Sequence, residues 1–537
     1  MYRKYGLPIR FQDLPLEVCV SIFHHLPALD VVRLEQVSTE FRKLVRESVT
    51  LQYKIECFLC GVVDQTPGTH TVADKRRSLK FWHQRWKRPG FTEVCEFSGY
   101  LGKGYVSGPI FAQACRDSID EQCSSIEFYA FDAPLRGVRD RDWVLSNLNV
   151  NYNFAIDWYQ DLLVVVESSE DSRDFIVRFL TCTTGSVHPA AEQETFQLML
   201  PVESTSQDFK LQICGDLLML QYEYFGRMFI EMWAIDWRKG RLLLQLGEDH
   251  DVDDVVTVPV DCALIDSRYV LVALTGDSQT PALVGLDCYQ MPAGVSRLVL
   301  EGIMQNALFV LELPRVLPGH FSDDLRLSVA CNPHSPHALP SQMDDSTVFR
   351  AAGAPVVLVG LECGETPPNR LRYDLLIPGR FILSQLHRAS APGAHRLAWQ
   401  AYSRECRIVN TGYRSCAGVV HGARYATSCK VWVPNGGAFV DVLEISHFLE
   451  PAAIYRDTDV EDGQSDDPGL QPAVCCVVKP SDQSNDEVWA EPMHTGAPYL
   501  ATWTDLVLED ADELFLLEDG VVVSERDTSE HMHAYTF

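Results

Sequence analysis

The sequence predicts a multidomain α+β chain, in which a small all-α module precedes a large all-β domain. Its 537 residues exceed one ordinary domain of roughly 100–200 residues. Apolar residues recur at helical spacing up to residue 90, whereas from Glu93 onward the apolar runs are short, β-branched and bounded by turn residues. A weak strand repeat with a period near 50 favours an irregular β-propeller of about seven or eight blades, and leaves the closure of the ring open.

Helical spacing begins at Pro15, a residue that suits the first turn of a helix. Val18 and Ile22 follow four residues apart on one face, and Pro27 ends this helix. Shorter helices follow, and Ser38 is well suited to cap one of them. Residues 11–90 are therefore expected to be helical.

A further helix is predicted over residues 72–88, after a loop rich in turn residues. Leu79, Trp82 and Trp86 fall on one side of it, and we expect that side to pack against the all-β domain. The basic residues of the segment 75–88 alternate with aromatic ones, a pattern also found in nucleic-acid binding. An amphipathic helix with its basic side toward water or acidic loops is the simpler interpretation.

The strand repeat is clearest in three copies around Ile156, Ile213 and Ile265, which are 57 and 52 residues apart. Each copy alternates apolar and polar residues, turns at an Asp, and continues into a second strand. Two stretches, near 331–346 and 457–471, are rich in Pro, Ser, Asp or Gly and are expected to be loop insertions. No long helix is expected within residues 93–537 outside 444–450.

Charge is unevenly divided along the chain, whose net charge is −29. Residues 1–90 hold 15 basic and 9 acidic residues, a net of +6, and the remaining 447 hold 30 basic and 65 acidic, a net of −35. An acidic body repels phosphate backbones, so nucleic acid is not an expected partner. The aliphatic runs are far shorter than the ~18–20 residues of a membrane span, so no membrane is expected either.

The cysteine pattern indicates a reducing compartment. The chain holds 17 Cys, an odd number, mostly scattered singly, and it shows neither an apolar secretory segment nor an Asn-x-Ser/Thr glycosylation site. Reduced thiols of this kind are typical of cytoplasmic or nuclear proteins. We therefore expect the protein in one or both of these compartments.

No motif in the sequence predicts catalysis or a resident metal or cofactor. The pair Cys57 and Cys60 has no second pair for zinc, and is expected to pack in a core. The segment GEDHDVDD lacks the Gly and Glu of a calcium loop, and Gly102-x-Gly104 is interpreted as a strand bulge rather than a dinucleotide site. Since HExxH and GxSxG motifs are also absent from the sequence, we expect no metal, no cofactor and no enzyme activity.

The stretch FQDLPLEVCVSIFHHLPALDVVRLEQVSTEFRKLV resembles an F-box in the order and spacing of its Leu-Pro pairs and apolar positions. The resemblance implies a module over residues 10–50 that docks on the Skp-type adaptor of SCF ubiquitin ligases, followed by a helical linker (51–92) and the β domain (93–537). The residues it implies for adaptor binding are Leu14, Pro15, Glu17, Ile22, Phe23, Leu26, Pro27 and Val31, and those for the module core are Val18, Phe41 and Leu44.

More loosely, fragments of the rest of the chain, among them KRRSLKFWHQRWKRPGF, MWAIDWRKGRLLLQL and APYLATWTDLVLED, resemble basidiomycete fungal F-box proteins with an irregular WD-repeat-like region. The F-box resemblance implies a substrate receptor that joins an unidentified target protein to the adaptor and, through it, to a cullin. Catalysis would then be proximity, with the chemistry on other chains. An F-box scaffold without ligase output and an enzyme built on a propeller are the alternatives.

Overall fold

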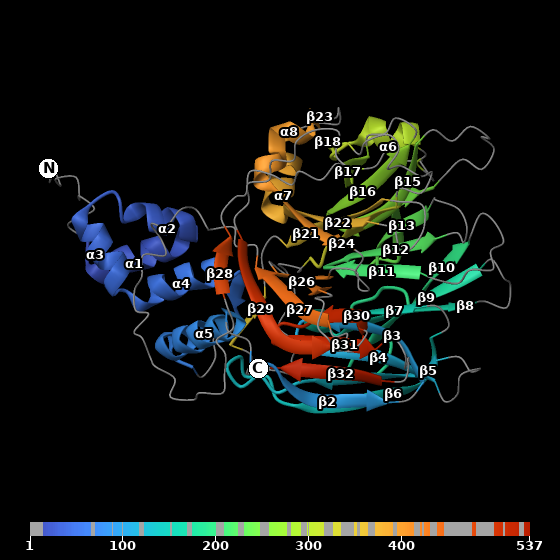
Figure 1. The fold of residues 1–537 in the computed structure, drawn as a ribbon, viewed down its shortest axis with the longest axis horizontal. Coiled ribbons are helices and arrows are strands. Elements are labelled where there is room, and N and C mark those ends of the chain that lie inside the picture. The colour runs from blue at the N-terminus through green and yellow to red at the C-terminus, as the bar shows by residue number, and fades with distance from the viewer. Residues whose placement is uncertain are drawn as a thin grey trace, which may run out of the picture.

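A computed structural model describes the chain in segments, and Figure 1 shows their arrangement. The helical module lies at one end, and the sheets form a ring beside it. The described residues are 14–65, 70–87, 90–98, 100–116, 123–150, 153–168, 174–199, 209–223, 230–247, 257–276, 281–290, 298, 300–315, 326–333, 348–351, 355–363, 371–389, 395–412, 419–421, 424–429, 438–444, 475–478, 499–508, 511–525 and 531–536.

The N-terminal part is helical, as expected from its spacing. Its elements are α1 (Leu16–His25), α2 (Ala28–Leu34), α3 (Thr39–Glu47), α4 (Val49–Leu59), a short strand β1 (Val62–Asp64) and α5 (Val72–Lys87). Ser38 caps α3 by accepting a hydrogen bond from the backbone N–H of Phe41 at 3.1 Å. Pro15 and Pro27 stand directly before α1 and α2, where a missing N–H costs no helical hydrogen bond.

Among the described residues, seven sheets of four or five strands follow, and each forms one blade of a β-propeller. Neighbouring strands are antiparallel except for β18 and β23. Blades 1 to 3 each have four strands, which are, in blade 1, β3 (Tyr100–Ser107), β4 (Ile110–Arg116), β5 (Cys123–Ala130) and β6 (Arg141–Val150); in blade 2, β7 (Asn153–Asp157), β8 (Leu162–Ser168), β9 (Asp174–Thr181) and β10 (Thr195–Met199); and in blade 3, β11 (Phe209–Cys214), β12 (Leu217–Glu223), β13 (Ile230–Asp236) and β14 (Arg241–Leu246). Blade 4 is formed by β15 (Thr257–Leu264), β16 (Tyr269–Gly276), β17 (Ala282–Asp287), β18 (Phe309–Glu312) and β23 (His395–Leu397), and blade 5 by β19 (Arg326–Ala330), β21 (Val356–Cys363), β22 (Leu371–Pro378) and β24 (Arg407–Gly412). Blade 6 is formed by β25 (Val419–His421), β26 (Arg424–Cys429), β27 (Ala438–Glu444), β29 (Tyr499–Leu508) and β28 (Cys475–Val478), and blade 7 by β30 (Ala511–Leu516), β31 (Gly520–Glu525), β32 (His531–Thr536) and β2 (Thr92–Ser98).

The ring is closed, which the sequence had left open. Contacts between neighbouring blades run through β30 and β3, β3 and β7, β7 and β11, β11 and β15, β15 and β19, β21 and β25, and β25 and β30, and so return to blade 7. Blade 7 itself joins the two ends of the domain, because β2 follows the helices and pairs with β32 as the outermost strand. Side chains also connect neighbouring blades: the ammonium of Lys210 in blade 3 donates to Asp261 in blade 4 at 2.8 Å.

The apolar side chains of each blade pack against those of its neighbours. The residues that marked the sequence repeat occupy equivalent places: Ile156 and Ile213 lie on the innermost strands β7 and β11, and Ile265 directly follows β15. All three are buried. The spacing of about 50 residues is therefore the spacing of blades, as predicted.

Among the described residues of the β domain, three α-helices were not predicted: α6 (Leu300–Asn306), α7 (Gly379–Arg388) and α8 (Trp399–Tyr402). The expectation that no long helix interrupts residues 93–537 was wrong for α7, whose Ile382 and Leu386 complete the core between blades 4 and 5. The predicted insertion 457–471 lies outside the described residues, as does 334–346 of the other insertion. Just after the predicted insertion near 331–346, the strand β20 (Phe349–Ala351) pairs with β1.

Candidate functional site

The first four helices close around a small core of their own. Cys19 and Phe23 of α1 meet Val31 of α2 and Leu44 of α3 in this core. Leu51 of α4 is fully buried in the same cluster. The module is therefore a four-helix unit, and α4, which we had placed in the linker, belongs to its core.

The solvent side of α1 carries apolar side chains that this core does not cover. Leu16 is 64% exposed, Val18 42% and Ile22 39%, and Pro15 at the start of the helix is exposed as well. We call these four residues the α1 apolar surface. Exposed apolar side chains gathered on one short helix are typical of a surface that a partner covers.

The structure corrects three of the expected roles. Phe23 is 2% exposed and Val31 is fully buried, so neither faces a partner, while Val18 is exposed and lies outside the core. The reason is the position of α4, whose Leu51 and Ile55 pack in one core with Cys19 and Phe23 of α1. Val18 lies on another side of α1 and stays exposed.

The other residues that the sequence analysis named lie as follows. Leu14 and Leu26 are half-buried against the module core, Pro15, Glu17, Ile22 and Pro27 are exposed, Phe41 is half-buried, and Leu44 is buried. Phe41 packs edge-on against Phe23, with ring centroids 5.3 Å apart. Adaptor binding by the exposed members stays a prediction.

The elements α4, β1 and α5 lead from the module to the ring, and we call them together the arm; its first helix, α4, also belongs to the module core. Its helix α5 packs on blade 7 with Leu79, Trp82 and Trp86, which are 0%, 2% and 2% exposed. They share one apolar cluster with residues of β30 and β31, namely Leu514, Leu516, Val521 and Val523. The prediction that these three residues pack against the all-β domain is confirmed.

The turn between β30 and β31 satisfies both indole N–H groups of the arm. Trp82 Nε1 donates to Asp519 Oδ1 at 2.8 Å, and Trp86 Nε1 donates to the backbone oxygen of Glu518 at 3.1 Å. The guanidinium of Arg424, from blade 6, lies over both rings at 4.5 and 4.1 Å from their centroids. Cation–π attraction adds to apolar burial here, since the Arg is itself desolvated.

A second attachment joins the arm to blade 5. Strand β20 belongs to the connection between β19 and β21, and it pairs antiparallel with β1, with Val62 opposite Ala351 and Asp64 opposite Phe349. The ring of Phe349 also packs edge-on against Trp82 at 5.4 Å. Two independent contacts therefore fix the direction of the arm relative to the ring.

A buried polar cluster lies beneath the arm and joins blades 7, 1 and 2. Arg136, in the connection between β5 and β6, pairs with both Glu518 and Asp519, and its Nη1 lies 2.5 Å from Asp519 Oδ2. The hydroxyl of Tyr159 donates to Glu518 at 3.1 Å. The sequence analysis missed this cluster, because no local sequence pattern indicates that single charged residues 382 or 383 positions apart are in contact.

Burial is the largest single influence on the pKa of Tyr159, Asp519 and Arg136. It raises the pKa of the Tyr159 hydroxyl well above its usual range, and the charge of Glu518 raises it further. Burial also raises the pKa of Asp519, against the opposing effect of Arg136. For Arg136, burial lowers the pKa, but the two carboxylates outweigh this and the net direction is upward. The guanidinium is therefore charged at all accessible pH values.

The basic residues of α5 are largely paired with carboxylates of the arm itself. Lys75 is 4% exposed and its Nζ lies 2.7 Å from Asp64, and Arg76 forms a two-pronged contact with Glu56. Lys80 approaches the same Glu56 at 3.6 Å. The expectation that this side of the helix faces water or acidic loops was therefore wrong for Lys75.

The cysteine pair and the glycine motif that the sequence analysis considered have structural roles. Cys57 is buried, and burial raises the pKa of its thiol to about 12. Gly104 stands at a register shift of β3, where an added Cβ would approach Phe111 and Phe515 at 2.9 Å. In the part of the chain that the structure describes, no three His, Cys, Asp or Glu side chains are grouped to hold a metal ion, and no helix is long and apolar enough to cross a membrane.

Comparison with protein families assigns the helical module. Residues 11–55 match the F-box-like family. The match begins just before α1 and ends within α4, so it covers three of the helices that share the module core and the first part of the fourth. The chain therefore carries an F-box-like helical segment followed by a β-propeller, which is the fold class that the sequence predicted. No curated protein matches the sequence.

Solved structures resemble the chain only distantly. Hydrazine synthase of Kuenenia stuttgartiensis is 11% identical with a TM-score of 0.34, covering 83% of this chain and 97% of that one. Prolyl oligopeptidase B of Galerina marginata is 8% identical with a TM-score of 0.26, and oligopeptidase B of Trypanosoma brucei is 10% identical with a TM-score of 0.27. Both matches cover 64% of this chain, which spans only 39% and 38% of those peptidases. No activity is carried over from scores this low.

Proposed function

We propose that the protein is the substrate-receptor subunit of an SCF-type ubiquitin ligase. The observation that carries the proposal is the α1 apolar surface: an F-box-like module with a complete core of its own still exposes Leu16, Val18 and Ile22. F-box domains bind Skp-type adaptors, and an adaptor groove would cover these side chains. A cullin would join through the adaptor, in the cytoplasm or the nucleus.

In this proposal the β-propeller holds the target, and the chain itself performs no chemistry. Ubiquitin transfer would be accelerated because the target lysine is kept near the conjugating enzyme at high effective concentration. The attachment of the arm to blades 5 and 7 supports this role, since a fixed arm sets the distance between adaptor and target.

The experiment is capture of a purified Skp-type adaptor by the full chain, compared with two matched variants. Ile22→Asp places a charge on the α1 apolar surface, and Val49→Asp places the same charge on α4, where the side chain is 41% exposed. We expect Ile22→Asp to weaken binding by roughly 30- to 1,000-fold, the effect of losing an interface anchor worth about 2–4 kcal/mol. The control variant should bind like the parent.

Three outcomes contradict the proposal, two in adaptor binding and one in ligase output. A parent chain that does not bind the adaptor removes the F-box role, and equal binding by both variants removes the α1 apolar surface from the interface. Circular dichroism of each variant shows whether the helices are intact. A chain that binds the adaptor, but whose loss from cells leaves every ubiquitinated protein unchanged, is a scaffold without ligase output.

A further inference from the structure

Two indole rings form a site for a cation where blade 1 meets blade 2. The guanidinium of Arg141, the first residue of β6, lies 4.6 Å from the ring centroid of Trp143 and 4.8 Å from that of Trp158. Trp143 belongs to β6 as well, and Trp158 begins the turn between β7 and β8. The two ring centroids are 5.6 Å apart. We call Trp143 and Trp158 the indole pair.

Contacts between the two blades hold both rings in place. Trp143 stacks on the buried ring of Phe128 with centroids 4.9 Å apart, and its Nε1 donates to the backbone oxygen of Cys182 in blade 2 at 2.9 Å. The backbone N–H of Trp158 donates to the hydroxyl of Ser107 in blade 1 at 3.0 Å. The indole pair is therefore preorganised, and a cation that enters it need not order the rings.

The guanidinium of Arg141 is attached through the rings rather than through carboxylates. In the part of the chain that the structure describes, it donates no hydrogen bond and forms no ion pair. Half-buried Asp161 interacts with it electrostatically, but this carboxylate accepts the N–H and the hydroxyl of Thr183 at 3.0 and 2.8 Å. The main attachment of Arg141 is therefore cation–π attraction, which another cation of the same shape would share.

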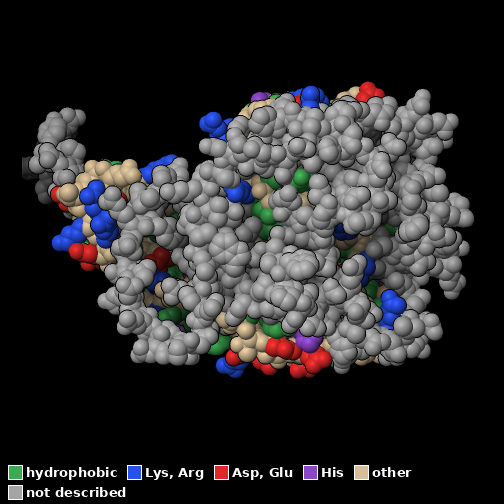
Figure 2. All heavy atoms as spheres, in the orientation of Figure 1, with side chains coloured by type: hydrophobic (Ala, Val, Ile, Leu, Met, Phe, Trp, Pro, Cys, Tyr) green, Lys and Arg blue, Asp and Glu red, His purple; other side chains and the backbone are tan. Residues whose placement is uncertain are grey.

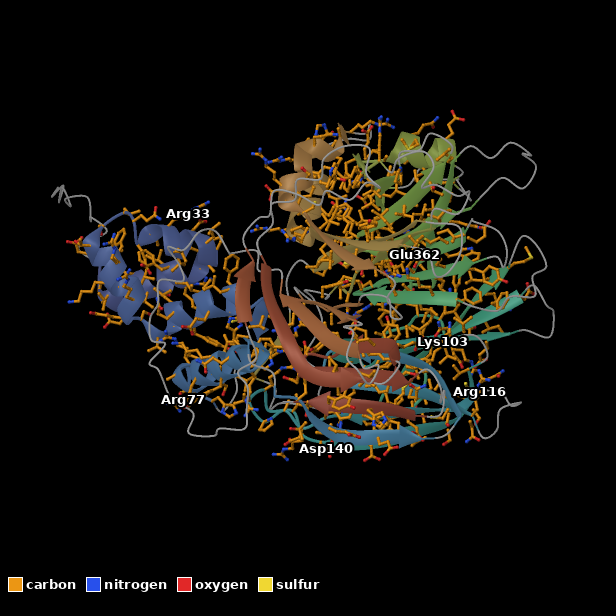
Figure 3. The ribbon with its side chains drawn as sticks, in the orientation of Figure 1. Arg33, Arg77, Lys103, Arg116, Asp140 and Glu362 are labelled. Carbon is orange, nitrogen blue, oxygen red and sulfur yellow. The ribbon has the colours of Figure 1, made fainter. Side chains whose placement is uncertain are left out.

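The indole pair lies at the surface of the ring. The strand β6 is the outermost strand of blade 1, and both Arg141 and Trp143 are only half-buried. The residues just before Arg141, Arg139 and Asp140, are exposed, and Figure 3 shows Asp140 at the lower edge of the ring. A segment of a partner therefore reaches the indole pair once the side chain of Arg141 moves aside.

The charge of this edge favours a cationic ligand. Four exposed carboxylates lie near the Cys95 thiol on β2, and two of them flank Arg141 in the chain. They are Glu93, Glu96, Asp140 and Asp142. Burial raises the pKa of the Cys95 thiol, and these four charges raise it further. Figure 2 shows Asp or Glu side chains along the lower edge of the molecule, where β2 and β6 lie in Figure 1. Negative charge of this kind raises the local concentration of cations.

We propose that the indole pair binds an arginine side chain of the target protein, and that Arg141 is a built-in occupant which this ligand displaces. The word "target" rests on the proposed function, whereas the binding chemistry rests on the two rings and on the guanidinium that they already hold. A guanidinium is planar and weakly hydrated, so it stacks on an indole face better than the compact, strongly hydrated ammonium of Lys.

The indole pair shares a side of the ring with the arm. Trp158 belongs to the turn between the first and second strands of blade 2. The corresponding turn of blade 7, between β30 and β31, binds Trp82 and Trp86. Corresponding turns of a propeller lie at the same mouth of the ring. A target bound here is therefore on the side of the ring from which the arm leads to the F-box-like module.

The test measures the anisotropy of a labelled, otherwise neutral peptide with one Arg, and of the same peptide with Lys instead, on the full chain. Arg141→Ser and Arg141→Gln remove the built-in occupant. The matched control Arg139→Ser removes the same charge from an exposed neighbour. We expect both Arg141 variants to bind the Arg peptide at least about tenfold more tightly than the parent, the gain expected if Arg141 fills the site about nine-tenths of the time. The control should bind like the parent, and the Lys peptide should bind more weakly than the Arg peptide.

Each other result overturns the inference. Equal binding by the parent and the Arg141 variants, or no binding by any of them, excludes a ligand site at the indole pair. An equal gain in Arg139→Ser shows a response to net charge, and a Lys peptide that binds as tightly as the Arg peptide excludes recognition by stacking. Adaptor capture is measured in parallel. A chain that keeps the adaptor but fails the peptide test loses only this inference, and one that binds the peptide but not the adaptor loses only the proposed function.

Discussion

Trp82 and Asp519 are 437 residues apart in sequence, and the indole N–H of the first donates to the carboxylate of the second at 2.8 Å inside the protein. Trp82 belongs to the arm and Asp519 to the turn between β30 and β31 of blade 7. The same carboxyl group also pairs with Arg136. One buried carboxylate therefore fixes both the arm and the connection between β5 and β6 within blade 1.

Replacing Trp82 by Phe should destabilise the protein by roughly 1–3 kcal/mol, because the apolar ring remains but a buried hydrogen bond to a charged group is lost. The free energy of unfolding in urea measures the change. The neighbouring Phe81 is 52% exposed, so Phe81→Ala should stay within about 0.5 kcal/mol of the parent. A Phe variant as stable as the parent would show that the hydrogen bond adds nothing to the packing of the arm.

Removing the Arg136 guanidinium should lower the free energy of unfolding by more than the Trp82 replacement does. Arg136→Met leaves Glu518 and Asp519 without their cation in a site where Arg136 and Glu518 are both fully buried, and we expect a loss of about 3–5 kcal/mol. A variant that also carries Glu518→Gln and Asp519→Asn removes the uncompensated charges. It should recover much of the loss in the same urea experiment. An unchanged unfolding midpoint in the single variant would refute this assignment.

Asp157 should contribute a pH dependence to stability. Burial raises its pKa above the usual 3.8, although Gln160 and the backbone N–H of Tyr159 donate hydrogen bonds to it and Arg350 lies near. A carboxyl whose pKa is higher in the folded than in the unfolded state stabilises the protein fully below the unfolded pKa. That stability is lost as the pH rises through the folded pKa.

The check is the free energy of unfolding of the parent and of Asp157→Asn, measured from pH 3.8 upward. We expect the parent to lose stability relative to the variant as the pH rises through the folded pKa, after which the difference becomes constant. Parallel curves over this range would exclude a raised pKa at Asp157.

Gly379 should not tolerate a side chain. An added Cβ would lie 2.2 Å from the backbone oxygen of Pro355, which also accepts the Gly379 N–H at 2.8 Å. Gly379→Ala must therefore displace the start of α7 and should cost about 1–3 kcal/mol. Gly90→Ala is the matched control, since a Cβ there meets nothing within 4 Å. Thermal melting of both variants compares them, and equal melting temperatures would contradict the expected clash.

Much of the fold could be predicted because it depends on local periodicity. Ile156, Ile213 and Ile265 repeat at the blade spacing, since each blade must bury the same inward side chains. Trp82 and Trp86 were assigned to the ring-facing side of α5 for a similar reason: two Trp residues on one side of a basic helix need a large apolar surface.

Roles that depend on packing between distant segments were beyond such patterns. Val18 and Phe23 are both apolar residues of α1, and the packing of α2, α3 and α4 around the helix decides which of them is buried. Arg136 and Glu518 are single charged residues in turns, where charge usually means solvent. The helix α7 was not predicted because it is an insertion between two strands of one blade, and an insertion does not follow the blade repeat. Its hydrophobic face packs on the core between blades 4 and 5.

The pairing of β2 with β32 has a consequence for the order of events during synthesis. The helical module leaves the ribosome first, but the turn that receives Trp82 and Trp86 is made more than 430 residues later. At about 5–20 residues per second, the arm waits roughly 20–90 s before its binding surface exists. During that time both indoles and the open edge of β2 are exposed, so a newly made chain needs protection from aggregation until its last blade is complete.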